Sequence, residues 1–210
     1  MKLYMVPAAP NPTKVMLYVA ERAHAGTDMG IEQVVVNTLK GAQRSEEHLQ
    51  RNPFGTLPVL ELDDGSFLIE SLAIIGYLEE KFPAGSFLGE DVETRAKARE
   101  LERVIEMRVA LPMSRYVHAT NSPLKLPPDP QLAAELEKSL PVALGYVEKI
   151  LGDGRDLLCG SDVSIADCTL QAAFQFARFG KADLLGDFPL LQAWDGRYRS
   201  RPAAQDVLKF

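Results

Sequence analysis

The sequence has few cysteines, no long hydrophobic run and no excess of positive charge. Two cysteines among 210 residues, Cys159 and Cys168, are too few for a disulfide framework or a four-ligand zinc site, so we expect a reducing compartment and no metal. No window approaches the ~18 uninterrupted apolar residues that a membrane-spanning helix needs. The 23 Lys and Arg against 29 Asp and Glu leave a net charge of −6, which argues against a nucleic-acid-binding protein.

Disorder and a signal peptide are not expected either. The 15 Gly and 14 Pro are close to average usage, so the chain does not have the composition of a disordered protein. The N-terminal apolar run carries one Lys and ends at Pro7, which is too short for a signal peptide. With 46% hydrophobic and 25% charged residues, the composition predicts a cytoplasmic globular protein with a buried core.

The first part of the chain alternates between strand and helix patterns. Asn11 and Pro12 suit the N-cap and first turn of a helix. The expected elements are, in order, a strand at 2–6, a helix at 13–23, a strand at 31–36, a short helix at 45–51, a hairpin at 58–62 and 66–69, and a helix at 71–82. A strand–helix–strand opening followed by a hairpin predicts a mixed four-stranded sheet.

The rest of the chain has helical patterns and no convincing strand. Expected helices cover 92–116, 131–151, 164–179 and 189–201, and Pro112 is expected to bend or end the first of them. The residues around Gly85 are typical of a linker. We therefore expect an α/β domain at 1–82, a linker at 83–90 and an all-helical domain at 91–210.

Three segments resemble those of the cytosolic glutathione transferase superfamily. They are Asn52-Pro-Phe-Gly-Thr-Leu-Pro-Val-Leu60 with Glu70-Ser71 downstream, Ala9-Pro-Asn-Pro-Thr-Lys-Val15, and Ser164-Ile-Ala-Asp167. The resemblance covers essentially the whole chain. It implies a thioredoxin-like N-terminal domain that binds glutathione as cosubstrate, a helical-bundle C-terminal domain, a homodimer and a small-molecule electrophile as second substrate.

Four residues are expected to bind most of the glutathione. The resemblance implies a cis Leu57-Pro58 bond, which leaves the peptide groups of Leu57 free to pair with a bound tripeptide like an added strand. It also implies that Ser71 binds the γ-glutamyl carboxylate, while Glu70 accepts from the γ-glutamyl amine. A helix N-terminus favours such an anion. The alternatives are that Pro58 is an ordinary turn proline and that Ser71 caps a helix. Capping and ligand binding by Ser71 are compatible.

The sequence offers Asn11 and two weaker candidates for the group that stabilises the thiolate. Ala9 stands where many relatives have Ser, Thr or Cys, so the usual hydroxyl is missing. Asn11 remains as the expected catalytic residue, because an amide N–H at a helix N-terminus lowers a thiol pKa. The alternative is that Asn11 only caps the helix. Thr13 is a weaker candidate, and Tyr4 is more typical of a core residue.

The glycyl carboxylate of glutathione also needs a partner. Relatives often have Lys at the position of Thr56, which this sequence does not. Lys40 is the expected substitute, with Arg44 and His48 as alternatives, and the departure predicts weaker or altered binding.

The second substrate is expected between the two domains. The expected pocket residues are Ala9, Met107, Arg108, Leu111, Arg115 and Tyr116, and Ala8, His118, Phe174 and Phe179 are further candidates. Ser164 and Asp167 are expected to form a capping box with a structural role.

The leading hypothesis is a detoxifying transferase in which the bound thiolate attacks a small hydrophobic electrophile. A glutathione-dependent disulfide reductase is the alternative enzyme, indicated by Pro10-Asn11 and by the missing hydroxyl at Ala9. The third hypothesis is a glutathione-binding interaction module of low activity. In the homodimer, Phe54 is expected to anchor one subunit in its partner.

Overall fold

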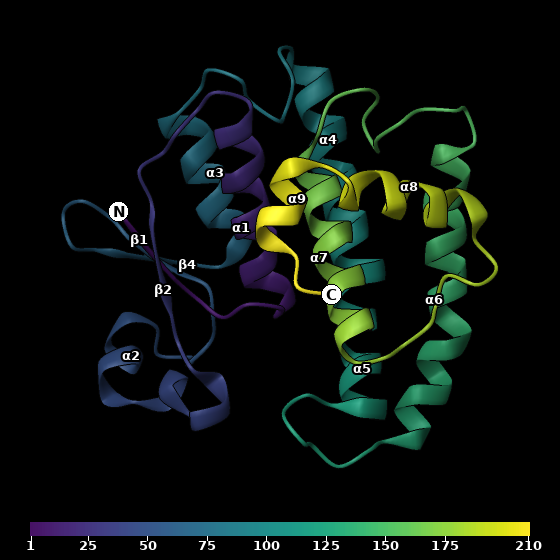
Figure 1. The fold of residues 1–210 in the computed structure, drawn as a ribbon, viewed down its shortest axis with the longest axis horizontal. Helices are drawn as coiled ribbons and strands as arrows, with labels where there is room; N and C mark the ends of the chain where they lie inside the picture. Colours follow the sequence, from purple (N-terminus) through teal and green to yellow (C-terminus); the bar gives the residue numbers. More distant parts are fainter.

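The computed structural model describes residues 1–210 and has a small α/β domain beside a helical domain (Figure 1). The α/β domain contains β1 (Lys2–Met5), α1 (Pro10–His24), β2 (Glu32–Val35), the 3₁₀ turns η1 (Thr38–Lys40) and η2 (Ala42–Arg44), α2 (Glu46–Arg51), β3 (Val59–Glu61), β4 (Phe67–Ile69) and α3 (Ser71–Lys81). The helical domain contains α4 (Val92–Ile105), the π-helical segment η3 (Glu106–Ala110), α5 (Leu111–Asn121), α6 (Pro130–Leu151), α7 (Ile165–Phe179), α8 (Pro189–Arg199) and α9 (Pro202–Val207).

The sheet has the strand order β2-β1-β3-β4. β1 pairs parallel with β2, and β3 pairs antiparallel with both β1 and β4, so the predicted mixed four-stranded sheet is confirmed. The β3–β4 hairpin turns at Gly65, whose positive φ of 82° is easy for a residue without a Cβ. Val59 faces Ile69 across the hairpin, so the turn before β3 and the start of α3 lie at the same end of the sheet.

α1 begins earlier than its sequence pattern predicts. Pro10 is the first helical residue and Ala9 is the N-cap, so the expectation that Asn11 caps the helix is wrong. Proline suits the first turn because its φ is already helical and its missing N–H would have no partner there. Asn11 therefore lies inside the first turn, where it is exposed.

Helical structure continues from Val92 through Pro112 to Asn121, so the helix does not end at the proline. The π-helical segment η3 lies directly before α5, which has Pro112 in its first turn. Proline lacks the N–H that a continuous helix would use and crowds the carbonyl four residues earlier, and a wider π turn accommodates both effects. The inserted turn also rotates the helix faces after it relative to those before it.

The two domains share one core. α1 packs on α7 and α9, and Figure 1 shows α1 directly beside α7. The fully buried Lys14 of α1 lies 3.4 Å from Glu102 of α4 and also pairs with Glu106 of η3. Burial removes the hydration of each of these charges, so a charge that lost its partner would be strongly unfavourable. The pairing therefore holds α1 against α4 in one position.

The end of the chain differs from the expected single helix at 189–201. α8 ends at Arg199, and Pro202 starts the separate helix α9. Arg201 between them reaches back to α1, where its guanidinium forms two hydrogen bonds of 2.8 Å with Glu21. Among all the helices, none combines the length and the apolar character that crossing a membrane requires.

Candidate active site

The turn before β3 leaves both main-chain hydrogen-bonding groups of Leu57 without a partner. The Leu57–Pro58 bond is cis, and neither the N–H nor the C=O of Leu57 forms a hydrogen bond within the chain. The preceding carbonyl, that of Thr56, accepts from Nε2 of the buried His48 at 3.1 Å and from Nδ2 of Asn52 at 3.0 Å. These two bonds hold the turn, so the free groups of Leu57 are presented to a ligand by a fixed backbone.

The start of α3 lies beside this turn and is not capped by a side chain. Glu70 is the N-cap residue, has a positive φ of 70° and forms no capping hydrogen bond, while Ser71 is buried at the first helical position. A non-glycine residue in this region of φ costs about 1–3 kcal/mol. The exposed Glu70 carboxylate and the free N–H groups of the first turn are complementary to an amine and a carboxylate, respectively.

The start of α1 offers one free main-chain donor. Pro10 and Pro12 have no N–H, and the N–H of Thr13 is bonded to the carbonyl of Ala9 at 3.0 Å. The N–H of Asn11 has no partner within the chain. The positive end of the helix dipole is therefore accessible to an anion mainly through the main chain and side chain of Asn11.

The two weaker candidates for the thiol site are engaged elsewhere. The hydroxyl of Thr13 is fully buried and accepts from Nε2 of Gln175 at 3.1 Å. The Tyr4 hydroxyl donates to Glu61 at 2.6 Å, and burial raises the pKa of Tyr4. Both side chains therefore serve the packing of the fold.

The start of α1 and the turn before β3 share a cleft of about 460 Å³ between the two domains. Pro58, Glu70 and Ser71 are not among its lining residues. On the α/β side, Ala9, Asn11 and Leu57 line the cleft together with Gln43 and Arg44. On the helical side the lining residues are Ser114, His118, Pro123, Leu124, Phe176 and Phe179. One wall is thus rich in peptide groups and the other in apolar rings.

The residues near the expected glycyl end differ from the sequence prediction. Lys40 is exposed on η1 and does not line the cleft, although Thr38 and Leu39 of the same turn do. His48 does not face the cleft either, since it is buried beneath Thr56. Arg44 lines the cleft, and so does Gln43, whose buried Oε1 has no partner.

His118 is the titratable group of the helical wall. Its Nδ1 lies 2.8 Å from the hydroxyl of Ser122, and its ring lies 5.3 Å from that of Phe176. Burial lowers the pKa of His118 below its usual value, because desolvation disfavours the imidazolium. A neutral imidazole beside a cleft is able to accept a proton.

Most of the expected second-substrate residues lie outside this cleft. Ala9 lines it, but Met107, Arg108, Leu111, Arg115 and Tyr116 do not. Tyr116 instead donates to Glu137 of α6 at 2.9 Å, and both arginines are exposed. On α5 the cleft is lined by Ser114 and His118, which lie one turn apart on one face, whereas Leu111 and Arg115 lie on another face.

Comparison with known proteins identifies the architecture. Residues 3–87 match the family "Glutathione S-transferase, N-terminal domain" and residues 104–202 match "Glutathione S-transferase, C-terminal domain". Glutathione S-transferase F10 of Arabidopsis thaliana is 32% identical, with 85% of each chain covered. The chain belongs to the glutathione S-transferase family.

Two further relatives show how broad the glutathione S-transferase likeness is. A probable maleylacetoacetate isomerase 2 of Drosophila melanogaster is 31% identical over 78% of this chain and 69% of its own. The crystal structure of Gtt2 from Saccharomyces cerevisiae has a TM-score of 0.85 at 27% identity and covers 99% of this chain and 100% of its own. The predicted superfamily and the predicted fold, a thioredoxin-like domain followed by a helical domain, are confirmed.

The sequence prediction missed several lining residues of this glutathione S-transferase. Gln43, Ser114 and Phe176 were not among the candidates, whereas His118 and Phe179 were named only as further walls. Phe174, also named, belongs to the core, where its ring meets Trp194 edge-on at 5.9 Å. The only sequence signal for Ser114 and His118 was their spacing of four residues, which places them on one helix face. That spacing fits a solvent-exposed face equally well.

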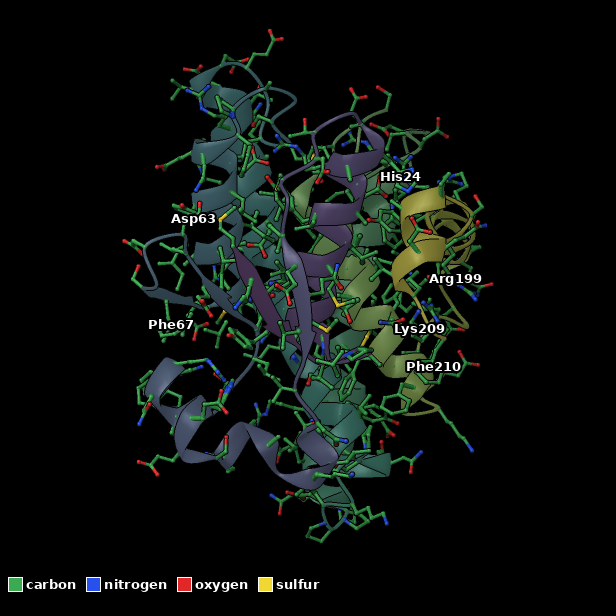
Figure 2. All side chains as sticks on the ribbon, turned by 60° about the vertical axis from the view of Figure 1, so that its left-hand side comes forward. His24, Asp63, Phe67, Arg199, Lys209 and Phe210 are labelled. Carbon is green, nitrogen blue, oxygen red and sulfur yellow. The ribbon has the colours of Figure 1, made fainter.

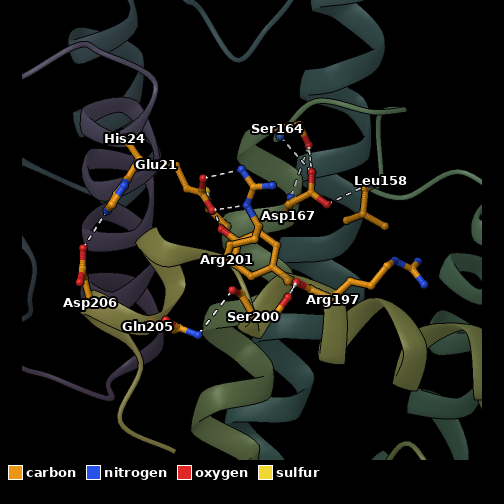
Figure 3. Close-up of polar contacts among 12 residues, drawn as sticks. Glu21, His24, Leu158, Ser164, Asp167, Arg197, Ser200, Arg201, Gln205 and Asp206 are labelled. Atoms are coloured by element: carbon orange, nitrogen blue, oxygen red, sulfur yellow. Dashed lines mark hydrogen bonds and ion pairs between the residues drawn. The ribbon is translucent and has the colours of Figure 1, made fainter.

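A larger cavity, of about 770 Å³, lies at the other end of α1 and contains no part of this site. Some of its charged side chains are paired: Glu21 pairs with Arg201, and His24 lies 2.8 Å from Asp206 (Figure 3). Cys159 lines this cavity, whereas Cys168 is fully buried in α7. The two thiols do not form a disulfide.

Proposed function

We propose that this protein activates the thiol of glutathione for attack on a small hydrophobic electrophile. The observation that carries the proposal is the cleft in which the free peptide groups of Leu57, the start of α1 and an apolar helical wall meet. We further propose the division into domains 1–82 and 91–210 with a linker at 83–90, a cytoplasmic location, and detoxification as the role.

Each end of glutathione has a proposed partner. The γ-glutamyl end binds Glu70 and the first turn of α3 at Ser71, and the cysteinyl backbone pairs with Leu57 beside Pro58. The glycyl carboxylate binds Arg44, and the unpartnered Oε1 of Gln43 accepts from an N–H of the tripeptide. These two residues take the role that the sequence pattern gave to Lys40.

The thiolate is held at Asn11, by its free main-chain N–H and by its side-chain amide. Lowering a thiol pKa by two units takes about 2.7 kcal/mol. A hydrogen bond to a charged group contributes about 1.5–3 kcal/mol, and the helix terminus adds to this. The neutral His118, on the opposite wall, accepts the thiol proton.

Three variants separate these roles. Asn11→Ala keeps the main-chain N–H and Asn11→Pro removes it, so a much larger loss of kcat in the second variant identifies the main chain as the thiolate donor. His118→Gln is expected to leave the titration of the thiol itself on the acid side of the pH profile and to remove the second limb, that of His118. That limb lies below the ordinary histidine pKa of about 6.5, because the neutral base is lost only as the pH falls through the lowered value.

The first experiment is calorimetric titration with reduced glutathione, followed by kinetics with 1-chloro-2,4-dinitrobenzene. Saturable binding and turnover are expected. Binding without turnover toward a broad electrophile panel would favour the interaction module. Turnover of a glutathione mixed disulfide in place of electrophiles would favour the reductase, for which the non-hydroxyl Ala9 is the observation.

We also propose a homodimer with Phe54 as an anchor. Phe54 is 65% exposed and Val92 is 67% exposed, which is costly for large apolar side chains in a monomer. Light scattering is expected to give twice the chain mass, and Phe54→Ser is expected to shift the equilibrium toward the monomer. A monomeric unaltered protein at micromolar concentration contradicts this proposal.

A further inference from the structure

The helical wall of the cleft continues into a row of aromatic rings. The rings of His118 and Phe176 lie 5.3 Å apart, those of Phe176 and Phe179 lie 6.5 Å apart, and Phe210 stacks on Phe179 at 4.6 Å with an interplanar angle of 27°. The first three rings line the cleft, and Phe210 does not. Phe210 therefore affects the cleft only through Phe179.

The segment that carries Phe210 is held in place by side chains of α7. Nε of Arg178 donates to the carbonyl of Phe210 at 3.0 Å, and the N–H of Lys209 donates to Oε1 of Gln175 at 2.6 Å. Figure 2 shows Lys209 and Phe210 together beside the helical domain. Residues beyond α9 are thus docked on α7, although no helix or strand includes them.

Gln175 connects this docked segment to the thiol end of the cleft. Its side chain is fully buried, and its Nε2 donates to the hydroxyl of Thr13 in the first turns of α1 at 3.1 Å. One amide group therefore holds both the end of the described chain and the helix that carries Asn11. The position of Phe210 is tied to the same framework as the thiol site.

The charges of the cleft indicate what the aromatic wall accepts. No Asp or Glu lines the cleft, and its one arginine, Arg44, comes from the α/β wall. Burial keeps His118 neutral by lowering its pKa. Arg108 and Arg115, which would suit an acidic cosubstrate, are both outside. The helical wall therefore offers ring faces and no cation.

We propose that Phe210 is a positioning residue that fixes the ring of Phe179, so that the cleft selects flat, uncharged aromatic electrophiles. The proposal rests on the proposed glutathione function of the same cleft. Phe179 is 37% exposed, and without the stacked neighbour its ring is free to leave the orientation in which it forms a wall. An offset stacked pair stabilises that orientation.

The test compares two glutathione derivatives by calorimetry. S-methylglutathione occupies only the glutathione half of the cleft, whereas S-(4-nitrobenzyl)glutathione also reaches the aromatic wall. Phe210→Ala is expected to lower the affinity for the nitrobenzyl derivative by about three- to tenfold, which is the range of one aromatic pair. The affinity for S-methylglutathione is expected to stay unchanged. Phe210→Tyr is expected to restore binding, and Phe210→Leu is not, because it keeps apolar area without a ring to stack.

Kinetics give a second readout. In Phe210→Ala, the KM for 1-chloro-2,4-dinitrobenzene rises by a similar factor while kcat and the KM for glutathione stay constant. Leu190→Ala, which removes a 40% exposed apolar side chain on α8, is the matched control and changes neither. S-(4-carboxybenzyl)glutathione is expected to bind more weakly than the nitro derivative, because no cation meets its carboxylate.

The outcomes separate the two proposals. If the unaltered protein does not bind S-methylglutathione, the proposed glutathione function fails, and this inference fails with it. If S-methylglutathione binds but Phe210→Ala leaves the ratio of the two affinities unchanged, only the role of Phe210 is overturned. An equal loss for both derivatives also overturns it, because it indicates a general structural effect.

Discussion

The helices α3 and α7 both begin with a serine close to an acidic residue, yet the two starts differ in almost every contact. At α7 the Ser164 side chain accepts from the N–H of Asp167, and the Asp167 carboxylate accepts back from the N–H and hydroxyl of Ser164. That carboxylate also accepts from the N–H of Leu158 and from Trp194. The N–H groups of Ser164 and Asp167 and the hydroxyl of Ser164 therefore all have partners within this buried start (Figure 3).

At α3 the same residue types leave their groups free. Ser71 is the first helical residue, Glu70 is the N-cap in a left-handed conformation, and no side chain caps the helix. A helix start that is satisfied internally stabilises the fold, whereas one that is left open and held in a strained conformation is available to a ligand. The hydrogen-bond partners of each serine and acidic residue, and not the residue types, therefore separate a helix start that stabilises the fold from one that is available to a ligand.

The largest expected effect is the loss of stability when the hydrogen bonds at the start of α7 are removed. Asp167→Ala leaves buried donors of Ser164, Leu158 and Trp194 without a partner, so we expect the free energy of unfolding to fall by about 3 kcal/mol. Urea denaturation measures this loss. Asp162→Ala, which alters an exposed neighbour, is the control, and glutathione affinity should be unchanged in both variants.

The next effect is on the α3 side. Ser71→Ala is expected to lower glutathione affinity about tenfold, because a hydrogen bond to the γ-glutamyl carboxylate is lost, while stability changes by less than about 1 kcal/mol. Calorimetry and denaturation of the same preparation measure both quantities. Ser164→Ala should show the reverse pattern, and equal behaviour of the two serine variants would remove the distinction between the helix starts.

A third prediction separates strain from binding at one residue. Glu70→Gly is expected to raise the free energy of unfolding by about 0.5–1 kcal/mol, because glycine adopts the positive φ of 70° without a Cβ penalty. The same variant loses the carboxylate and with it glutathione affinity. Glu70→Gln should lose affinity without gaining stability, and a Glu70→Gly variant that is less stable than the unaltered protein contradicts the strain.

The smallest expected effect is that of salt. Raising the ionic strength from about 0.05 to 0.5 M should weaken glutathione binding about two- to threefold, because Glu70 and the groups at the start of α3 are close to solvent and are screened. The stability difference between the unaltered protein and Asp167→Ala should not change, because Asp167 is fully buried. Titrations and denaturation curves at both salt concentrations make the comparison.

The sequence by itself determined the fold and indicated the residues of the proposed glutathione site, because the signals for both are local. The turn at Leu57-Pro58, the pair Glu70-Ser71 and the capping box at Ser164 each lie within a few residues and act through the nearby backbone. The alternating strands and helices likewise follow from local patterns, which is why the mixed sheet and the helical domain were predicted correctly.

Only the tertiary structure decided the other wall and the ends of several elements. The packing of α5 decides which of its faces meets the cleft, and Ser114 and His118 line it in place of Leu111 and Arg115. Arg44 lines the cleft and Lys40 does not, and Phe210 meets Phe179 from 31 residues away. Such contacts depend on how distant segments pack, and a pattern of neighbouring residues does not record that packing.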